Sequence, residues 1–129
     1  MHVYLIVFLG GGIGATMRHG VNLAAARIFG TGLPFGTLIV NIVGSFVMGL
    51  LVEWFALKTD PGQHWRLFFT TGLLGGFTTF SAFSLDTALL VERGIPATAM
   101  GYALVSVLAS IGGLFLGLFV VRTIAQVSL

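Results

Sequence analysis

The fold of this chain depends most on the run Gly75-Gly76-Phe77-Thr78-Thr79-Phe80-Ser81-Ala82-Phe83-Ser84. It lies inside an apolar segment long enough to cross a membrane, yet its composition disfavours a continuous helix. Two adjacent glycines lower helix propensity, and the threonine and serine hydroxyls compete for backbone hydrogen bonds. Irregular backbone at membrane depth is tolerated only where it is buried in protein or lines a watery cavity. The stretch therefore predicts a broken membrane helix beside an ion or substrate site, as in a channel or transporter.

The whole chain has the composition of a membrane protein. Hydrophobic residues make up 57% of its 129 residues and charged residues 8%, and its mean hydropathy is +1.06, well outside the range of soluble domains. Four apolar stretches each approach the ~20 residues of a spanning helix, and they are Val3–Ala26, Leu33–Leu57, Leu67–Val91 and Pro96–Val121. The connections are too short to hold a soluble domain. We therefore predict an all-α membrane protein in which residues 1–129 form a single domain of four transmembrane helices, the third of them broken.

Several kinds of protein are excluded or disfavoured by what the chain lacks. No basic n-region precedes the first apolar run, so we do not expect a cleavable signal peptide. The chain has no cysteine, which excludes disulfides, thiolate metal sites and cysteine nucleophiles. The sequence pI of about 9.7 rests on six scattered basic residues. Such scatter indicates charge flanking a bilayer and not a nucleic-acid partner.

The basic residues are balanced between the two sides of the bilayer. With the N-terminus in the cytoplasm, the cytoplasmic side holds Lys58, Arg66 and Arg122, and the other side holds Arg27, Arg93 and, if it reaches that surface, Arg18. The positive-inside rule orients a protein by an excess on one side, and here almost none exists. The balance favours insertion in both orientations, and hence an antiparallel, dual-topology homodimer. The alternative is one orientation fixed by weaker signals.

Polar residues follow one face of two spans. In the second span they recur every four residues, at Thr37, Asn41 and Ser45. The carboxamide of Asn41, near the middle of that span, serves either as an interhelical hydrogen bond or as a pore-lining group. In the fourth span three hydroxyls share a face, those of Tyr102, Ser106 and Ser110, before the apolar Leu114. Two such stripes on different helices favour a hydrated track.

Aromatic and charged residues in the spans favour an anion. Phe80 and Phe83 share a face of a local helix, and the positive edges of their rings can approach an anion, although such rings more often pack or face lipid. A cation pathway would use carboxylates or convergent carbonyls. Arg18 either faces a water-filled vestibule, where it raises the anion concentration, or snorkels to an interface. Glu53 and Asp86 lie nearer span ends, where we expect water to solvate them.

Small residues four apart predict close contacts between helices. The pairs are Ser45–Gly49, Gly72–Gly76 and Gly113–Gly117. The run Gly10-Gly11-Gly12-Ile13-Gly14 superficially matches a phosphate-binding loop, but a membrane span supplies neither the preceding strand nor the soluble helix of that motif. Helix packing is therefore favoured for the run as well. Asp60-Pro61-Gly62 and Gly94-Ile95-Pro96 predict turns.

Three motifs together resemble the Fluc-type (CrcB) fluoride channels. They are Gly12-Ile13-Gly14-Ala15-Thr16-Met17-Arg18, then Gly36-Thr37-Leu38 with Asn41 and Gly44-Ser45, and the run from Gly72 to Ser84. The likeness covers nearly the whole chain in order. It implies a dual-topology homodimer in the bacterial plasma or inner membrane, with two antiparallel pores that release toxic cytoplasmic fluoride passively, down its electrochemical gradient.

The resemblance also implies roles for particular residues. A structural Na⁺ at the dimer centre would be held by backbone carbonyls of both subunits, here those of Gly75 and Thr78. The ring edges of Phe80 and Phe83 would line the fluoride path, with Asn41 as a donor near its centre. The other polar groups implied along the path are Thr37, Thr79, Ser81, Ser84, Tyr102, Ser106 and Ser110, with Arg18 near an entrance. Leu114 departs from the family pattern, in which a hydroxyl continues the track.

Other functions fit parts of the sequence. Proton-coupled small multidrug or guanidinium exporters are also four-helix, dual-topology dimers, but they need a membrane-embedded carboxylate, and the first span has no Asp or Glu. A purely structural subunit would leave the break and the two polar stripes without a use. An enzyme is disfavoured because the spans hold no plausible nucleophile–base pair or metal-ligand set.

Overall fold

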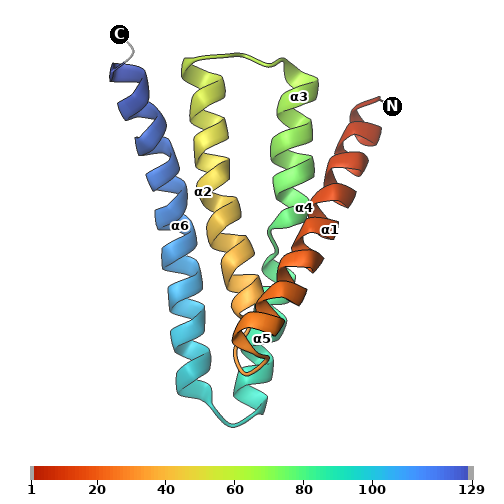
Figure 1. The fold of residues 1–129 in the computed structure, drawn as a ribbon, viewed down its shortest axis with the longest axis vertical. Coiled ribbons are helices and arrows are strands. Elements are labelled where there is room, and N and C mark those ends of the chain that lie inside the picture. The colour runs from red at the N-terminus through yellow and green to blue at the C-terminus, as the bar shows by residue number, and fades with distance from the viewer. Residues whose placement is uncertain (1, 128–129) are drawn as a thin grey trace.

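The computed structural model describes residues 2–127, and within that range the chain is helical with no strand. The elements in order are α1 (His2–Phe29), α2 (Phe35–Leu57), α3 (Gln63–Leu67), the π-helix η1 (Phe68–Leu74), α4 (Gly75–Phe77), α5 (Phe80–Glu92) and α6 (Pro96–Val127). Figure 1 shows both termini at the same end as the connection between α2 and α3, with the other two connections at the opposite end. The chain therefore traverses the structure four times, as the sequence predicts.

Three helical segments of the described range are long and apolar enough to cross a membrane, namely Phe35–Leu57, Gln63–Glu92 and Pro96–Gln126. The outward side chains of α6 illustrate why, since Leu104, Leu108 and Phe115 are all exposed. With 28 residues, α1 is also long enough to span, but its glycines and its Arg18-His19 pair lower its hydropathy. The protein is thus a multi-pass helical membrane protein, and a membrane-spanning role for α1 stays a prediction.

A glycine with a positive φ lies in each of the three connections: Gly30 follows α1, Gly62 precedes α3, and Gly94 lies between α5 and α6. Gly30, Gly62 and Gly94 have φ values of +80°, +91° and +81°, in the left-handed region that other residues rarely adopt. In the second connection the Gly62 N–H also donates to Asp60 Oδ1 at 3.0 Å. The predicted turns are confirmed, while several helix ends differ by a few residues. The longest difference is in α6, which continues beyond the predicted Val121 to Val127.

Glycines also set the distance between neighbouring helices. A Cβ on Gly49 of α2 would overlap the Leu114 carbonyl oxygen of α6, and one on Gly117 of α6 would overlap the Phe46 carbonyl oxygen of α2. On the other side of the molecule, Gly14 of α1 lies against the Leu73 backbone. Helix packing is therefore confirmed as a role of these glycines. The approach of α1 holds the third segment in place just before its break.

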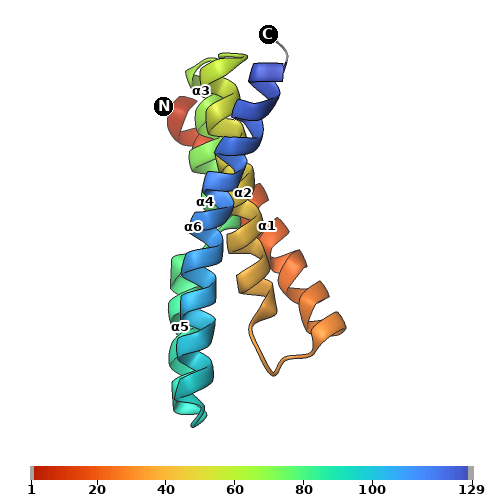
Figure 2. The ribbon, with the colours of Figure 1, turned by 90° about the vertical axis from the view of Figure 1, so that its left-hand side faces the viewer.

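The helices diverge toward the end that holds the α1–α2 and α5–α6 connections. Figure 2 shows α5 and α6 running together past the break, while α1 and α2 are joined by a connection on the other side. A small core holds α5 to α6, formed by Leu90, Ala99 and Tyr102 with Phe83 packed against it. The divergence opens space beside α5, and the cavities described below occupy that space.

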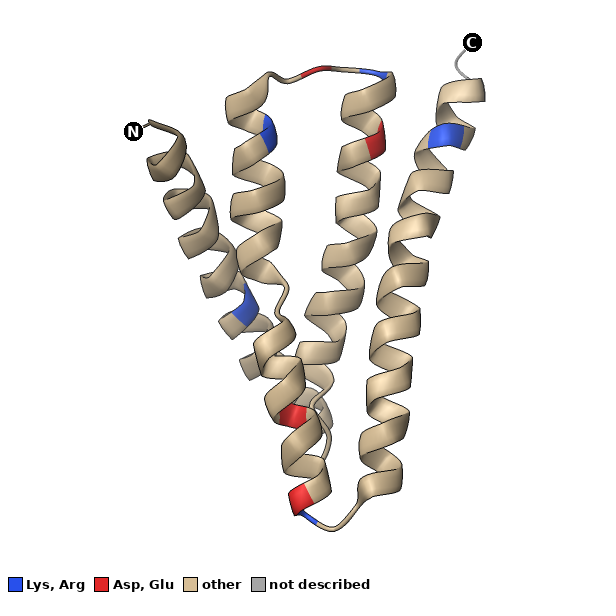
Figure 3. Cartoon of the chain, turned by 180° about the vertical axis from the view of Figure 1, so that it is seen from behind, with Lys and Arg blue, Asp and Glu red and all other residues tan. Residues whose placement is uncertain are grey.

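Most charged residues lie near the two ends of the helices, as Figure 3 shows. At the end that holds both termini, Arg122 Nε of α6 donates to Glu53 Oε2 of α2 at 2.6 Å. The Glu53 side chain is only 13% exposed, whereas that of Arg122 is 57% exposed. The pair is therefore an interhelical contact whose carboxylate is the more desolvated member.

We expect Arg122→Gln to lower the free energy of unfolding by about 1 kcal/mol, because the largely buried Glu53 carboxylate loses its charged hydrogen-bond partner. The effect stays modest because Arg122 itself is well solvated. The measurement is the unfolding midpoint of purified protein in detergent. The matched control is Arg66→Gln, since Arg66 pairs with Asp60 at 2.8 Å with both side chains exposed. If both variants lose the same stability, the burial of Glu53 is not what makes its ion pair with Arg122 stabilising.

Candidate functional site: the broken helix and its cavities

The third membrane segment breaks at Thr78 and Thr79, as the sequence predicts. Both residues have extended backbone, with φ −88° and ψ 159° at Thr78 and φ −154° and ψ 126° at Thr79. Before the break, η1 (Phe68–Leu74) is a π-helix, which the sequence did not predict. Such turns are frequent at functional sites. The helix resumes at Phe80, after a Thr79 whose hydroxyl accepts from the Ala82 N–H.

The Asn41 side chain joins α2 to this break. Its Nδ2 donates to the Thr79 carbonyl oxygen at 2.9 Å, and its Oδ1 accepts from the Thr79 N–H at 2.8 Å. One planar amide thereby satisfies both backbone groups of an extended residue. The interhelical bond, one of the two roles considered for Asn41, is present. An amide nitrogen carries two hydrogens, so a second donor remains beyond the bond to Thr79.

Two backbone carbonyls at the break are separated from the donors that a continuous helix would give them. In an α-helix, the Thr79 N–H would bond the Gly75 carbonyl and the Ala82 N–H would bond the Thr78 carbonyl. Here the Thr79 N–H donates to the Asn41 side chain instead, and the Ala82 N–H donates to the Thr79 hydroxyl at 3.1 Å. Gly75 and Thr78 are the two residues whose carbonyls the family resemblance implies as Na⁺ ligands.

The chemistry of these oxygens fits a cation. Backbone carbonyls are hard oxygen ligands of the kind that coordinates alkali and alkaline-earth ions. Within residues 2–127 no group of three or more His, Cys, Asp or Glu side chains is placed to hold a metal. The break therefore presents the carbonyl chemistry expected for Na⁺, although one chain contributes only two of the predicted ligands.

A cavity of about 320 Å³ lies between α2, the break and α6, and we call it the break cavity. Its lining mixes polar, aromatic and aliphatic residues, which are Asn41, Ser45, Thr78, Thr79, Phe80, Phe83, Ser106, Val107, Ser110 and Ile111. The rings of Phe80 and Phe83 lie 5.5 Å apart, inclined at 60°. Parts of both polar stripes and the phenylalanine pair thus meet around one space.

Two hydroxyls of the break cavity are buried without a partner. The Oγ atoms of Ser106 and Ser110 make no hydrogen bond with any described residue, and Ser106 is only 4% exposed. A buried polar group left unpaired costs about 1–3 kcal/mol. This arrangement is favourable when the cavity holds something that the hydroxyls can bond. A hydroxyl donates equally well to water or to an anion.

Tyr102 lies one turn from Ser106 on α6, and it contacts Phe83 across the helix pair. The two ring centroids are 5.6 Å apart. The Tyr102 hydroxyl donates to Asp86 Oδ2 at 3.3 Å. Asp86, which we expected to be solvated near a span end, is partly buried and takes part in this contact. Its position three residues after Phe83 was the signal in the sequence that could have revealed it.

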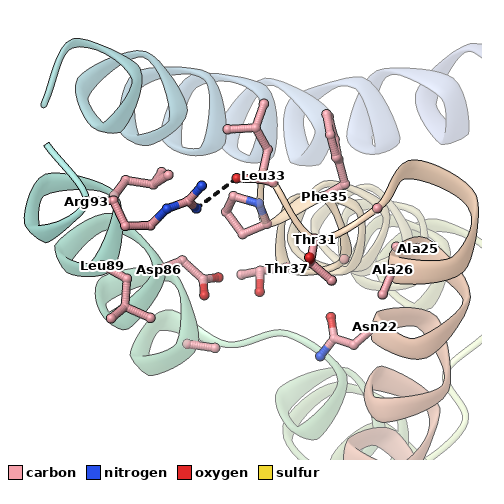
Figure 4. A pocket seen from close by; sticks show the side chains of 16 residues that line it. Asn22, Ala25, Ala26, Thr31, Leu33, Phe35, Thr37, Asp86, Leu89 and Arg93 are labelled. Carbon is pink, nitrogen blue, oxygen red and sulfur yellow. Dashed lines mark hydrogen bonds between the residues drawn. The ribbon is translucent and has the colours of Figure 1, made fainter. Parts of the chain in front are cut away.

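A second cavity, of about 340 Å³, opens where α1 ends and α2 begins, and we call it the mouth cavity. Its polar and charged lining residues are Asn22, Thr31, Thr37, Asp86 and Arg93 (Figure 4). An Arg93 guanidinium nitrogen donates to the Gly32 carbonyl oxygen at 2.9 Å, which ties the α5–α6 connection to the α1–α2 connection. Thr37 is one helical turn from Asn41, so the polar stripe of α2 leads from the mouth cavity to the break cavity.

Four predicted pathway residues line neither cavity: Tyr102, described above, and Arg18, Ser81 and Ser84. Arg18 Nε donates to the Gly76 carbonyl oxygen at 3.1 Å, so the structure places Arg18 between α1 and the segment before the break. Ser81 and Ser84 are exposed on α5, and Ser81 Oγ lies 3.3 Å from Thr79 Oγ1. Their places along an ion path stay predictions, since a single chain leaves this face of α5 uncovered.

Fold and site together define a class of protein. It is a multi-pass helical membrane protein whose broken helix borders a cavity lined by unpaired hydroxyls, an amide and aromatic rings. Such a site suits passage or binding of a small ion in the membrane. The chain belongs to the CrcB-like protein family (Camphor Resistance, CrcB), whose pattern it matches over residues 5–118.

Similar proteins with assigned names come from several bacteria. The fluoride-specific ion channel FluC of Granulibacter bethesdensis is 60% identical over 126 residues, which cover 98% of this chain and 99% of the relative. Fluoride-specific ion channel FluC 2 of Nitrobacter hamburgensis is 58% identical over 92% of this chain and 96% of its own length. The FluC of Rhodopseudomonas palustris is 54% identical over 94% and 98%. These relatives are ion channels by name, and the chain, as a member of their family, is not an enzyme.

Proposed function

We propose that this protein is a fluoride-selective channel that releases cytoplasmic fluoride passively. The observation that carries the proposal is the pair of buried, unpaired hydroxyls of Ser106 and Ser110 in the break cavity. Fluoride is small and strongly hydrated, so a pore must replace its water with several hydrogen-bond donors in a narrow space. The free Asn41 hydrogen and the ring edges of Phe80 and Phe83 add positive groups to those donors. The names of the similar proteins support the same ion.

A homodimer of antiparallel subunits would complete the site. Phe80 borders the break cavity yet is 76% exposed, and Gly75 is exposed as well. A ring that is meant to line an ion path needs a protein wall on its open side, because lipid offers no hydrogen bonds. A second copy in the opposite orientation would cover this face, and the balance of basic residues permits that orientation. The two-fold symmetry would then produce two antiparallel pores.

A structural Na⁺ would lie on the same two-fold axis. Each copy would contribute the carbonyl oxygens of Gly75 and Thr78, the two that the break separates from their helical amide donors. When bound, the ion would supply positive charge at the dimer centre, which favours anions in the adjacent cavities. No acidic side chain would be needed there, so the anion path would meet no repelling carboxylate at this point.

The direct test is fluoride efflux from liposomes that contain the purified protein, followed with a fluoride electrode. We expect rapid voltage-driven fluoride release, little chloride release, and a large loss of fluoride flux in Phe80→Ile. The control is Phe119→Ile, because Phe119 is exposed on α6 and lies in neither cavity. Absence of fluoride release from well-folded dimers would overturn the proposal, and proton-coupled guanidinium transport would be measured next.

A further inference from the structure

We infer that Asn41 holds the break open and couples a cation at the Gly75 and Thr78 carbonyls to the break cavity. The inference rests on the sodium site of the proposed function. The key juxtaposition is that one side chain bonds both backbone groups of Thr79 and also lines the cavity. Asn41 is therefore a positioning residue for the carbonyls, in addition to any contact it makes with an ion in the cavity.

The fit between Asn41 and Thr79 is specific to a carboxamide. Because Thr79 is extended, its N–H and C=O point to the same side, as in a residue of a β-strand. The Asn41 amide presents an acceptor and a donor side by side and pairs with both, at 2.8 and 2.9 Å. A carboxylate would keep the acceptor and lose the donor, and an aliphatic group of the same shape would lose both.

Removal of the Asn41 amide changes the balance at the break. The Thr79 N–H would then be unpaired at membrane depth, where each unsatisfied backbone group is costly. Its nearest alternative acceptor along the chain is the Gly75 carbonyl, the partner of a continuous α-helix. Closure of that bond would withdraw the Gly75 oxygen from a cation. Asn41 thus keeps the Gly75 carbonyl oxygen available to a cation without contacting that oxygen, because it holds the Thr79 N–H away from it.

The same contact links the two ions energetically. Movement of Thr79 toward a helical conformation would displace Asn41, and with it the remaining Nδ2 hydrogen that it offers to the cavity. Cation occupancy and the geometry of the anion cavity then both depend on whether Thr79 is extended or helical. Coupling of this kind is reciprocal, so a change that weakens cation binding through Asn41 also alters anion binding.

The experiment measures thermal stability of the purified dimer against Na⁺ concentration, with N-methylglucamine keeping the ionic strength constant. In Asn41→Leu, which is close in shape and lacks both hydrogen bonds, we expect the half-stabilising Na⁺ concentration to rise by about tenfold or more, within the range of typical site coupling. In Asn41→Asp the acceptor for the Thr79 N–H remains. We therefore expect Asn41→Asp to bind Na⁺ at least as tightly as the unmodified protein, so its half-stabilising Na⁺ concentration should be equal or lower. Its fluoride efflux should be lost, because the carboxylate repels the anion.

The matched control is Ser45→Ala, which changes the same cavity one turn further along α2. Its Na⁺ dependence should equal that of the unmodified protein. An unchanged midpoint in folded Asn41→Leu would overturn the inference and leave the sodium site standing, whereas no Na⁺ effect in the unmodified protein would overturn both.

If Asn41→Leu does not fold, Asn41→Ala provides the decisive measurement. It also removes both hydrogen bonds to Thr79, and it adds no bulk to the contact between α2 and the break. The half-stabilising Na⁺ concentration should again rise. A midpoint equal to that of the unmodified protein would overturn the inference.

Discussion

Gly14→Ala is expected to destabilise the protein by about 3 kcal/mol or more, at the upper end of the effects of overpacking. A Cβ at this position would overlap the Leu73 carbonyl oxygen and would lie 2.8 Å from the Phe77 backbone nitrogen. Both are backbone atoms, so no side-chain rotation can relieve the overlap. The change would force α1 away from the third segment at a point just before the break.

Thermal unfolding and the yield of folded protein on size exclusion measure this effect. The control is Gly20→Ala on the same helix, because nothing lies within 4 Å of a Cβ there. Alanine is the better helix former by about 1 kcal/mol, so this variant should be neutral or slightly more stable. If Gly14→Ala proves as stable as Gly20→Ala, close packing of α1 on the third segment is not what the glycine provides.

Simultaneous replacement of Ser106 and Ser110 by alanine is expected to reduce fluoride efflux by about 100-fold or more. A hydrogen bond to a charged group contributes about 1.5–3 kcal/mol, and two such bonds would be lost from the path. Each 1.36 kcal/mol in a barrier changes a rate about tenfold. This prediction depends on the proposed function, in which the two buried hydroxyls replace part of the water around fluoride.

The same double variant should lose no thermal stability, because neither hydroxyl has a partner among the described residues. Flux and stability would therefore change independently, which separates a role in the ion path from a role in packing. Thr123→Val is the control, since the Thr123 hydroxyl lies on the same helix, bonds the Phe119 carbonyl at 2.9 Å and is exposed. Normal fluoride efflux in the double alanine variant would remove the two serines from the pathway.

The contacts of the predicted site residues show how far local sequence patterns reach. The four-residue spacing of Thr37, Asn41 and Ser45 placed these residues on one face, and the structure has Asn41 and Ser45 at the break cavity with Thr37 at the mouth cavity. The same pattern left two roles open for Asn41. Only the position of α2 against the break shows that its amide bonds Thr79.

Other features depended on contacts between residues far apart in the chain. Arg18 donates to Gly76, 58 residues away, and Tyr102 donates to Asp86 on a neighbouring helix. Neither contact follows from spacing within one helix. The π-helix before the break also has no distinct pattern in its residues, Phe68–Leu74, and it lies against the glycine face of α1.

The amino-acid sequence was sufficient to predict the membrane class, the approximate helical segments and the position of the break. These features follow from hydropathy and from the local preferences of glycine, threonine and serine, which act within a few residues. Which polar groups meet follows only from the packing of the helices. Helix crossing, set by glycine contacts between α1 and the third segment and between α2 and α6, brings Asn41 to Thr79 and leaves Ser106 and Ser110 unpaired beside it. Hydrogen bonds require positions accurate to a few tenths of an ångström, and only the packed helices supply that accuracy.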